Sequence, residues 1–150
     1  MVCEQIDTED NGAQAGAPAL MDAICADPGL HLMGTLDDAT DVDWYGISAD
    51  WNNSCNDEAQ ITINVGQGLT VCAYHDCKSG SQLFQCAAGS TSATAPNSDP
   101  GCCGTDTTVL QWECNNNDND ALIWVSVTGA AAGQCLDYAG DYQMIGGNFL

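Results

Sequence analysis

Hydrophobic and polar residues alternate along much of this 150-residue chain. The clearest stretch is residues 59–65, where Ile61, Ile63 and Val65 alternate with polar residues, a period of two that predicts a β-strand with one buried face. Similar patterns predict strands at residues 32–36, 44–48, 69–74, 82–86, 108–114, 122–128 and about 138–145. Many short strands separated by turn residues predict an all-β fold, an antiparallel β-sandwich, with a closed barrel as the alternative.

Two stretches depart from this alternation. Residues 1–28 are expected to form an irregular leader packed on a sandwich domain that covers residues 29–150. Within the leader, residues 17–25 predict a short helix, because Pro18 would lie in its first turn. Residues 87–107 are rich in Ser, Thr, Gly and Pro and predict a long loop.

The charge of the chain excludes several classes of partner. Twenty-one acidic residues stand against a single basic one, Lys78, which gives a formal net charge of −20. Nothing in the chain could neutralise phosphates, so nucleic acid and anionic membranes are not expected partners. No apolar run approaches the roughly 20 residues that span a bilayer, which argues against membrane insertion. Because 45% of the residues are hydrophobic, we expect a folded acidic protein and not a disordered tail.

Cysteine usage indicates the compartment. An even number of cysteines spread along the chain predicts a disulfide framework and a secreted protein. The ten are Cys3, Cys25, Cys55, Cys72, Cys77, Cys86, Cys102, Cys103, Cys114 and Cys135. The adjacent Cys102 and Cys103 are expected to bond to different partners, because a bridge between neighbours strains the peptide. A zinc site at Cys72-x-x-His75-x-Cys77 is a weaker alternative, since no second ligand pair completes a tetrahedral set.

An acidic turn precedes the aromatic pair Trp44-Tyr45. Its carboxylates fall within seven residues and are Asp37, Asp38, Asp41 and Asp43. Two carboxylates ~4 Å apart repel by about 1 kcal/mol in water and more near a protein surface. The turn must therefore be solvated, carry a proton or bind a cation; a solvated acidic loop is the simplest of these.

Several short motifs, in a fixed order, resemble one protein family. These are residues 4–8 (Glu-Gln-Ile-Asp-Thr), 34–36 (Gly-Thr-Leu), 41–45 (Asp-Val-Asp-Trp-Tyr), 123–129 and 140–144. In this order the chain resembles the bacterial pre-peptidase C-terminal domain. That family has a jelly-roll-like β-sandwich fold and occurs beside secreted peptidases and in other extracellular bacterial proteins.

The resemblance implies a calcium site. In calcium-binding relatives, such as the collagen-binding domains of clostridial collagenases, acids of the leader and of the acidic turn share one ion. Carried over to this sequence, the implied ligands are Glu4, Asp7, Asp38 and Asp41, with Asp43 in a ligating or structural role. Calcium takes 6–8 oxygen ligands, so Ile6, where the family has a polar residue, removes one potential donor.

A second acidic stretch lies at residues 115–120. Its candidate calcium ligands are Asn115, Asn117, Asp118 and Asp120. It lacks the glycine and distal glutamate of an EF-hand loop, so a polar hairpin turn is the favoured interpretation.

Aromatic and histidine residues add little support for catalysis. Trp44 and Trp112 have the parity of core residues. Trp51 lies in a polar stretch that predicts a loop, and Trp124 faces the other side of its sheet, so these two are the candidates for ligand binding. His31 is expected at a loop or strand edge and His75 in an exposed hairpin, and neither lies beside a nucleophile motif.

The sequence thus predicts a secreted, non-enzymatic binding or adhesion module of the bacterial cell surface. Calcium would stabilise it, and its target would be an extracellular protein or polysaccharide. The alternative is a structural subunit that joins copies of itself into an extracellular filament or surface layer. An acid-pair hydrolase is the least favoured interpretation, because among 21 acids carboxylate pairs arise by coincidence.

Overall fold

The computed structural model describes residues 3, 12–25, 29–50, 58–78, 82–114, 119–131 and 133–150. Within these ranges the chain forms β-strands and one 3-10 turn, η2 (Gln14–Gly16). The strands are β1 (Ala23–Ile24), β2 (Leu30–Leu36), β3 (Asp43–Asp50), β4 (Glu58–Asn64), β5 (Thr70–Cys77), β6 (Gln82–Ala87), β7 (Thr91–Thr94), β8 (Pro100–Thr105), β9 (Thr107–Cys114), β10 (Ala121–Thr128) and β11 (Leu136–Gly147). None of the helices in the described ranges is long and apolar enough to cross a membrane.

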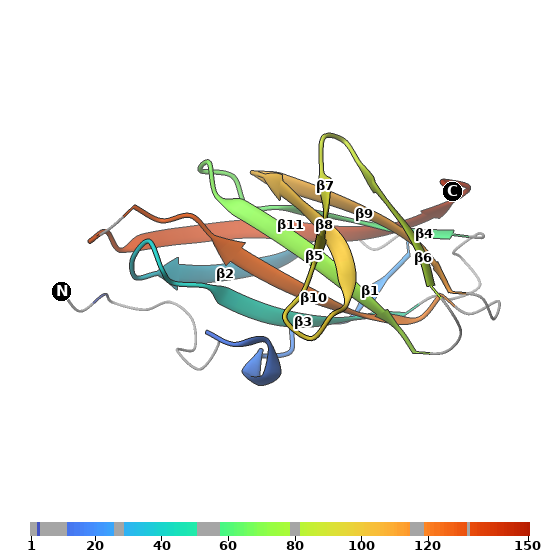
Figure 1. Cartoon of the computed structure of the whole chain (residues 1–150), viewed down its shortest axis with the longest axis horizontal. Helices are drawn as coiled ribbons and strands as arrows, with labels where there is room; N and C mark the ends of the chain where they lie inside the picture. Colours follow the sequence, from blue (N-terminus) through green and yellow to red (C-terminus); the bar gives the residue numbers. More distant parts are fainter. Residues whose placement is uncertain are drawn as a thin grey trace.

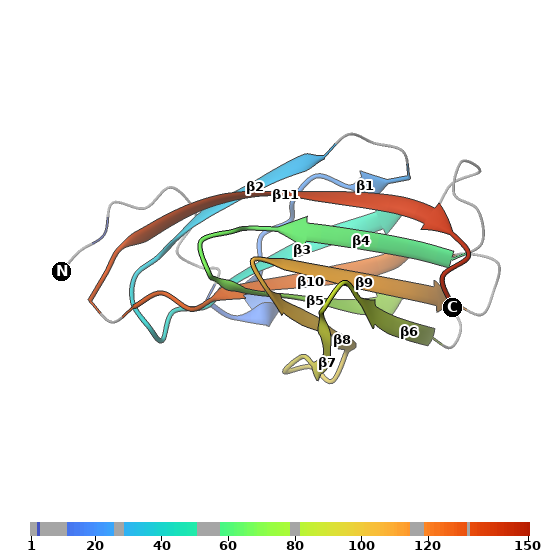
Figure 2. The same cartoon turned by 90° about the horizontal axis from the view of Figure 1, so that it is seen from above.

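The strands form two sheets that pack face to face. One sheet has the order β1-β3-β10-β5-β8-β7 and the other the order β2-β11-β4-β9-β6. Figure 1 shows β3, β10 and β5 running side by side, and the turned view of Figure 2 shows β2, β11, β4 and β9 in the same way. Neighbouring strands are antiparallel except for β1 and β3, which are parallel. The predicted antiparallel β-sandwich is confirmed.

The core lies between the sheets and follows the alternation of the sequence. On β4, Ile61 and Ile63 are completely buried, and their neighbours in the chain face outward. On β10, Ile123, Val125 and Val127 are completely buried in the same way. Burying one such side chain contributes about 1.5–3 kcal/mol, so the alternating strands supply most of the hydrophobic stabilisation.

The leader adds a parallel strand to β3, so the helix predicted around Pro18 is wrong. The amide of Leu20 donates to the Gly46 carbonyl at 2.8 Å, and the Gly46 amide donates to the Pro18 carbonyl at 2.9 Å. Further along, β1 continues the pairing with β3 and buries Ala23. The open edge of β3 thus gives the leader the backbone hydrogen bonds that a helix would otherwise have supplied.

The long loop predicted at residues 87–107 is also wrong, because the segment forms the hairpin of β7 and β8. Gly101 explains in part why the sequence of this hairpin shows no hydrophobic alternation. A Cβ atom at this position would collide with the Ala73 carbonyl, so β8 approaches β5 closely only because the residue is glycine. Small residues in this hairpin leave no hydrophobic alternation to detect.

Disulfides are present, as the cysteine count predicts, and two of them connect the sheets. The bonds between described cysteines are Cys3–Cys135, Cys72–Cys103, Cys77–Cys114 and Cys86–Cys102. The last two cross from one sheet to the other, and the first ties the leader to the segment before β11. Cys25 is also disulfide-bonded, whereas Cys55 lies outside the described residues. Multiple disulfides of this kind require an oxidising environment such as the extracellular space.

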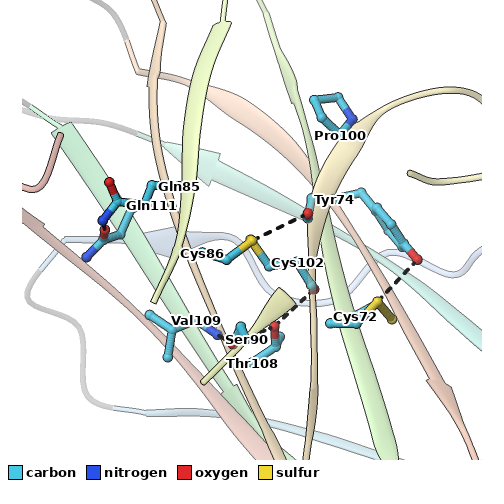
Figure 3. Close-up of a disulfide and its surroundings, with 12 residues drawn as sticks. Cys72, Tyr74, Gln85, Cys86, Ser90, Pro100, Cys102, Thr108, Val109 and Gln111 are labelled. Atoms are coloured by element: carbon cyan, nitrogen blue, oxygen red, sulfur yellow. Dashed lines mark hydrogen bonds between the residues drawn. A yellow bond between two sulfur atoms is a disulfide. The ribbon is translucent and has the colours of Figure 1, made fainter. Parts of the chain in front are cut away.

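The pairing of the adjacent cysteines is confirmed as well, since Cys102 and Cys103 bond to different partners. Figure 3 shows how the surroundings of Cys102 are held. Thr108 Oγ1 donates to the Cys102 carbonyl at 3.0 Å, and the Val109 amide donates to Ser90 Oγ at 2.9 Å. Side-chain hydroxyls therefore join β9 to the neighbouring hairpin around this disulfide.

His75 is completely buried, and its interpretation as an exposed hairpin residue is wrong. β5 continues to Cys77, so His75 keeps the inward parity of the strand and lies near Phe84 and Trp112, with ring centroids 5.6 and 6.4 Å away. Its Nδ1 lies 3.1 Å from the Pro100 carbonyl and therefore carries the hydrogen of the neutral ring. Burial lowers the pKa of His75 to about 4. His31, by contrast, is exposed on the edge strand β2, as predicted.

Candidate functional site

The acidic turn is organised by its own carboxylates. Oδ1 of Asp38 accepts hydrogen bonds from the amide and hydroxyl of Thr40 at 2.7 and 2.8 Å. Oδ2 of Asp41 accepts from the Asp37 amide at 2.7 Å. The hydrogen bond from the Thr40 amide is the main cause of a lowered pKa at Asp38, which keeps this exposed carboxylate ionised. These bonds are the local caps that Asp residues make in turns.

Asp43 has a different environment from the rest of the turn. It is 1% exposed and points into the sandwich from the first residue of β3. Its Oδ2 lies 2.7 Å from the hydroxyl of Tyr138, which comes from β11 of the other sheet. The buried Tyr45 hydroxyl lies 2.5 Å from the Tyr138 hydroxyl. The motif at residues 41–45 thus builds a hydrogen-bonded link between the sheets.

The residues described here therefore do not assemble the calcium shell that the family resemblance implies. Among them, no group of three or more His, Cys, Asp or Glu side chains is disposed to hold a metal ion. Asp38 and Asp41 shape the turn, and Asp43 faces the interior. Glu4 and Asp7 lie outside the described residues. Calcium binding that uses the leader stays a prediction.

The second candidate metal site falls largely outside the described residues, which exclude Asn115, Asn117 and Asp118. Asp120 is described, and its carbonyl accepts a hydrogen bond from the Lys78 amide at 3.0 Å. Next to it, Asn119 is 4% exposed, and its Oδ1 accepts from the Cys114 amide at 2.8 Å. Asn119 and Asp120, at the described end of this connection, are thus hydrogen-bonded to the end of β9 and to Lys78, which follows β5.

The zinc alternative is excluded by the disulfides. Both thiols of the Cys72-x-x-His75-x-Cys77 motif are bonded to other cysteines, Cys103 and Cys114. His75 faces the opposite side of the strand from Cys72, in the core.

The outer face of the six-stranded sheet carries a separate aromatic cluster. Trp44 and Tyr74 stack there with ring centroids 5.9 Å apart, and the half-buried Trp124 packs against the same cluster. Trp124 lies opposite Gly46 on one side and Tyr74 on the other. Gly46 lies beside the six-membered ring of Trp124, at a distance where a Cβ atom would make ordinary van der Waals contact (3.5 Å). Trp44 is therefore buried on the outer face of the sheet and not between the sheets, so its predicted place in the core is wrong: Tyr45, its neighbour in the chain, takes that side of β3.

A pocket of about 500 Å³ lies over this cluster, between the leader and the β7–β8 turn. Its lining residues are Ala13, Gln14, Ala15, Pro96, Asn97 and Trp124. A hydrogen bond joins the leader to the β7–β8 turn: the backbone N–H of Asn97 donates to Gln14 Oε1 at 3.2 Å. Of the two aromatic residues predicted to bind a ligand, Trp124 lines this pocket and Trp51 lies outside the described residues.

Two N–H groups of the pocket residues lack hydrogen-bond partners. Gln14 is 6% exposed, and neither its Nε2 nor Nε1 of Trp124 finds a partner in the part of the chain that the structure describes. An unsatisfied buried donor costs about 1–3 kcal/mol, and such groups are rare in folded proteins. The pocket therefore combines an aromatic surface with two unused donors, which is the composition of a site for a small polar ligand.

Sequence patterns gave no signal for Gln14 or Asn97. Both are polar residues in stretches without alternation, and they are 83 positions apart in the chain. Only the parity of Trp124, which placed it outside the core, pointed to this face.

Comparison with known proteins adds no relationship: no protein family, no curated protein and no solved structure matches the chain. The fold itself defines the class, a disulfide-rich all-β sandwich of two sheets. The resemblance to the pre-peptidase C-terminal domain stays a prediction from sequence motifs.

Proposed function

We propose that this protein is an extracellular, non-enzymatic binding module whose ligand occupies the pocket at Trp124. The observation that supports the proposal is the pair of unused N–H donors, on Gln14 and Trp124, in residues that line one pocket. A bound ligand would accept hydrogen bonds from these two N–H groups, which the folded chain leaves without partners.

The position of the pocket agrees with such a role. It lies on the outer face of a sheet, away from the core that holds the sandwich together. The cross-sheet disulfides Cys77–Cys114 and Cys86–Cys102 keep that sheet in place, so the site sits on a rigid support. A secreted module of the bacterial cell surface, attached to its target through this face, is the proposed context.

Retention on insoluble extracellular polymers tests the proposal. The purified protein would be sedimented with polysaccharides and, separately, with fibrous proteins. We expect retention on at least one polymer and a clear loss of retention in Trp124→Ala. Leu83→Ala is the matched control, because Leu83 is 53% exposed on β6 of the other sheet and does not line the pocket. Equal retention of wild type and Trp124→Ala, or none on any polymer, would overturn the proposal.

The alternative, a structural subunit of a filament, draws on the open sheet edges. β2 and β6 are the two edges of the five-stranded sheet, and they carry the exposed Met33 and Leu83. Edge strands with exposed hydrophobic residues are a common route to association between copies. Sedimentation velocity at rising concentration tests this function, which predicts oligomers that Met33→Lys or Leu83→Lys dissociates.

A further inference from the structure

The two donors at the pocket define the polarity of its ligand. The indole nitrogen of Trp124 can only donate a hydrogen bond. The side-chain amide of Gln14 can also act only as a donor toward a ligand. Its Oε1 already accepts a hydrogen bond from the backbone N–H of Asn97, and its Nε2 is the unused group. A ligand that satisfies both nitrogens must therefore present oxygen acceptors.

The charge of the protein narrows the class further. An anionic acceptor would face a net charge of −20. The only basic residue, Lys78, is engaged with Asp50 at 2.9 Å and does not line the pocket. A cation is disfavoured next to the two nitrogens, because the hydrogen of each N–H group, the positive end of its dipole, would face the ligand. Neutral oxygen acceptors are the remaining class.

The walls of the pocket indicate how such a ligand would lie. Ala13, Ala15 and Pro96 contribute apolar surface, and Trp124 contributes the aromatic ring. A sugar ring matches this combination, since one of its faces is made of C–H groups and its rim carries hydroxyl and ring oxygens. Aromatic side chains with a polar handle suit ligands that are apolar on one side and polar on the other.

We propose that the pocket binds a neutral saccharide, with the sugar ring against Trp124 and its oxygens accepting hydrogen bonds from Trp124 Nε1 and Gln14 Nε2. This inference rests on the proposed binding function and specifies its ligand class. Both nitrogens are shielded from water in the structure, so neighbouring side chains must shift for a sugar to reach them, while the hydrogen bond from Asn97 to Gln14 is kept.

Isothermal titration calorimetry with oligosaccharides of matched length tests the ligand class. The probes would be neutral tetrasaccharides of glucose, mannose and N-acetylglucosamine, the cationic tetramer of glucosamine, the anionic tetramer of galacturonic acid and a neutral tetrapeptide. We expect binding by at least one neutral saccharide and weaker binding or none by the charged tetramers and the peptide.

Variants then test the contacts. Trp124→Ala should weaken binding about thirtyfold or more, as the loss of a central aromatic residue does. Trp124→Phe keeps a ring but removes the donor and should weaken binding about fivefold. Gln14→Glu keeps an acceptor for the Asn97 amide but removes the Nε2 donor, and should weaken binding about tenfold or more. Gln143→Glu adds the same charge at an exposed position on β11 of the other sheet and should change nothing.

The outcomes separate this inference from the proposed function. Binding of a charged tetramer or of the peptide in preference to every neutral saccharide, lost in Trp124→Ala, would overturn the saccharide class and leave the binding module standing. Saccharide binding that Trp124→Ala and Gln14→Glu do not weaken would overturn the pocket as the site. No binding of any probe to a wild-type protein shown to be folded by near-UV circular dichroism would overturn both.

Discussion

The hydroxyl of Tyr138 lies 2.7 Å from Oδ2 of Asp43, and both residues are 1% exposed. The chain of contacts continues to the Tyr45 hydroxyl at 2.5 Å and from there to the Met33 carbonyl at 2.9 Å. Tyr138 donates to the buried Asp43 carboxylate, and Tyr45 donates to the Met33 carbonyl, so the two hydroxyls join the acid on β3 to β11 and β2 of the other sheet. Removing the partner of a buried charge is strongly destabilising, so we expect the Tyr138 hydroxyl to stabilise the fold through this contact.

Urea unfolding of two variants tests the contact between Tyr138 and Asp43. Tyr138→Phe removes the donor to a buried carboxylate and should lower the free energy of unfolding by about 3 kcal/mol or more. Asp43→Asn should cost about 1 kcal/mol or less, because its side-chain oxygen can still accept from Tyr138. Asp141→Asn is the control, since Asp141 is exposed on β11 and should leave the stability unchanged. A Tyr138→Phe variant as stable as the wild type would contradict this role of the hydroxyl.

Gly34 makes room for this network. A Cβ atom at this position would collide with the hydroxyls of both Tyr138 and Tyr45. We predict that Gly34→Ala lowers the free energy of unfolding by about 1–3 kcal/mol, because the added methyl overpacks the site. Gly12→Ala is the control in urea unfolding, since a Cβ there meets no atom within 4 Å. Equal stability of Gly34→Ala and Gly12→Ala would show that the site relaxes without cost.

Burial of His75 makes stability depend on pH in a defined window. Its pKa is lowered from 6.5 to about 4, mainly by loss of hydration, so between these values the unfolded chain binds a proton that the folded chain does not. Stability is therefore full above pH 6.5 and falls as the pH drops toward 4, by about 3 kcal/mol in total. His75→Asn removes the titrating group and keeps a donor for the Pro100 carbonyl.

Chemical denaturation of both proteins at several pH values measures this effect. The difference in unfolding free energy between wild type and His75→Asn should change across pH 4–6.5 and stay constant above it. Carboxylates titrate in both proteins, so their contribution cancels in the difference. Parallel curves would contradict the assignment of the window to His75.

Alternation predicted the strands whose side chains fill the core and missed those built from small residues. β4 and β10 each bury every second side chain, and the sequence shows this directly. The β7–β8 hairpin contains Gly101 at a point where backbone meets backbone, and that contact leaves no hydrophobic pattern. The leader was assigned a helix because nothing local shows that the edge of β3 is open to pair with it.

The candidate site was predictable only in part, for a similar reason. Trp124 has a strand parity that points away from the core, so it could be selected from the sequence. Gln14 matters only through its contact with Asn97, 83 positions away, and such a contact has no local signature. Asp43 was grouped with its acidic neighbours by proximity in the chain, whereas its strand parity turns it inward to Tyr138.

Calcium binding by the leader and the acidic turn is tested by thermal unfolding in calcium and in chelator. If Glu4 and Asp7 join Asp38 and Asp41 around an ion, calcium at a hundredfold excess over its Kd should add about 2.7 kcal/mol of stability and raise Tm. Asp38→Asn also disturbs the bonds to Thr40, so each variant must be compared with itself in the two buffers. The calcium-dependent gain should disappear in Glu4→Gln and Asp38→Asn and persist in Asp141→Asn. Because Asp43 already faces Tyr138 in the interior, Asp43→Asn should retain most of the gain. A wild-type Tm that is the same in calcium and in chelator would rule out the site.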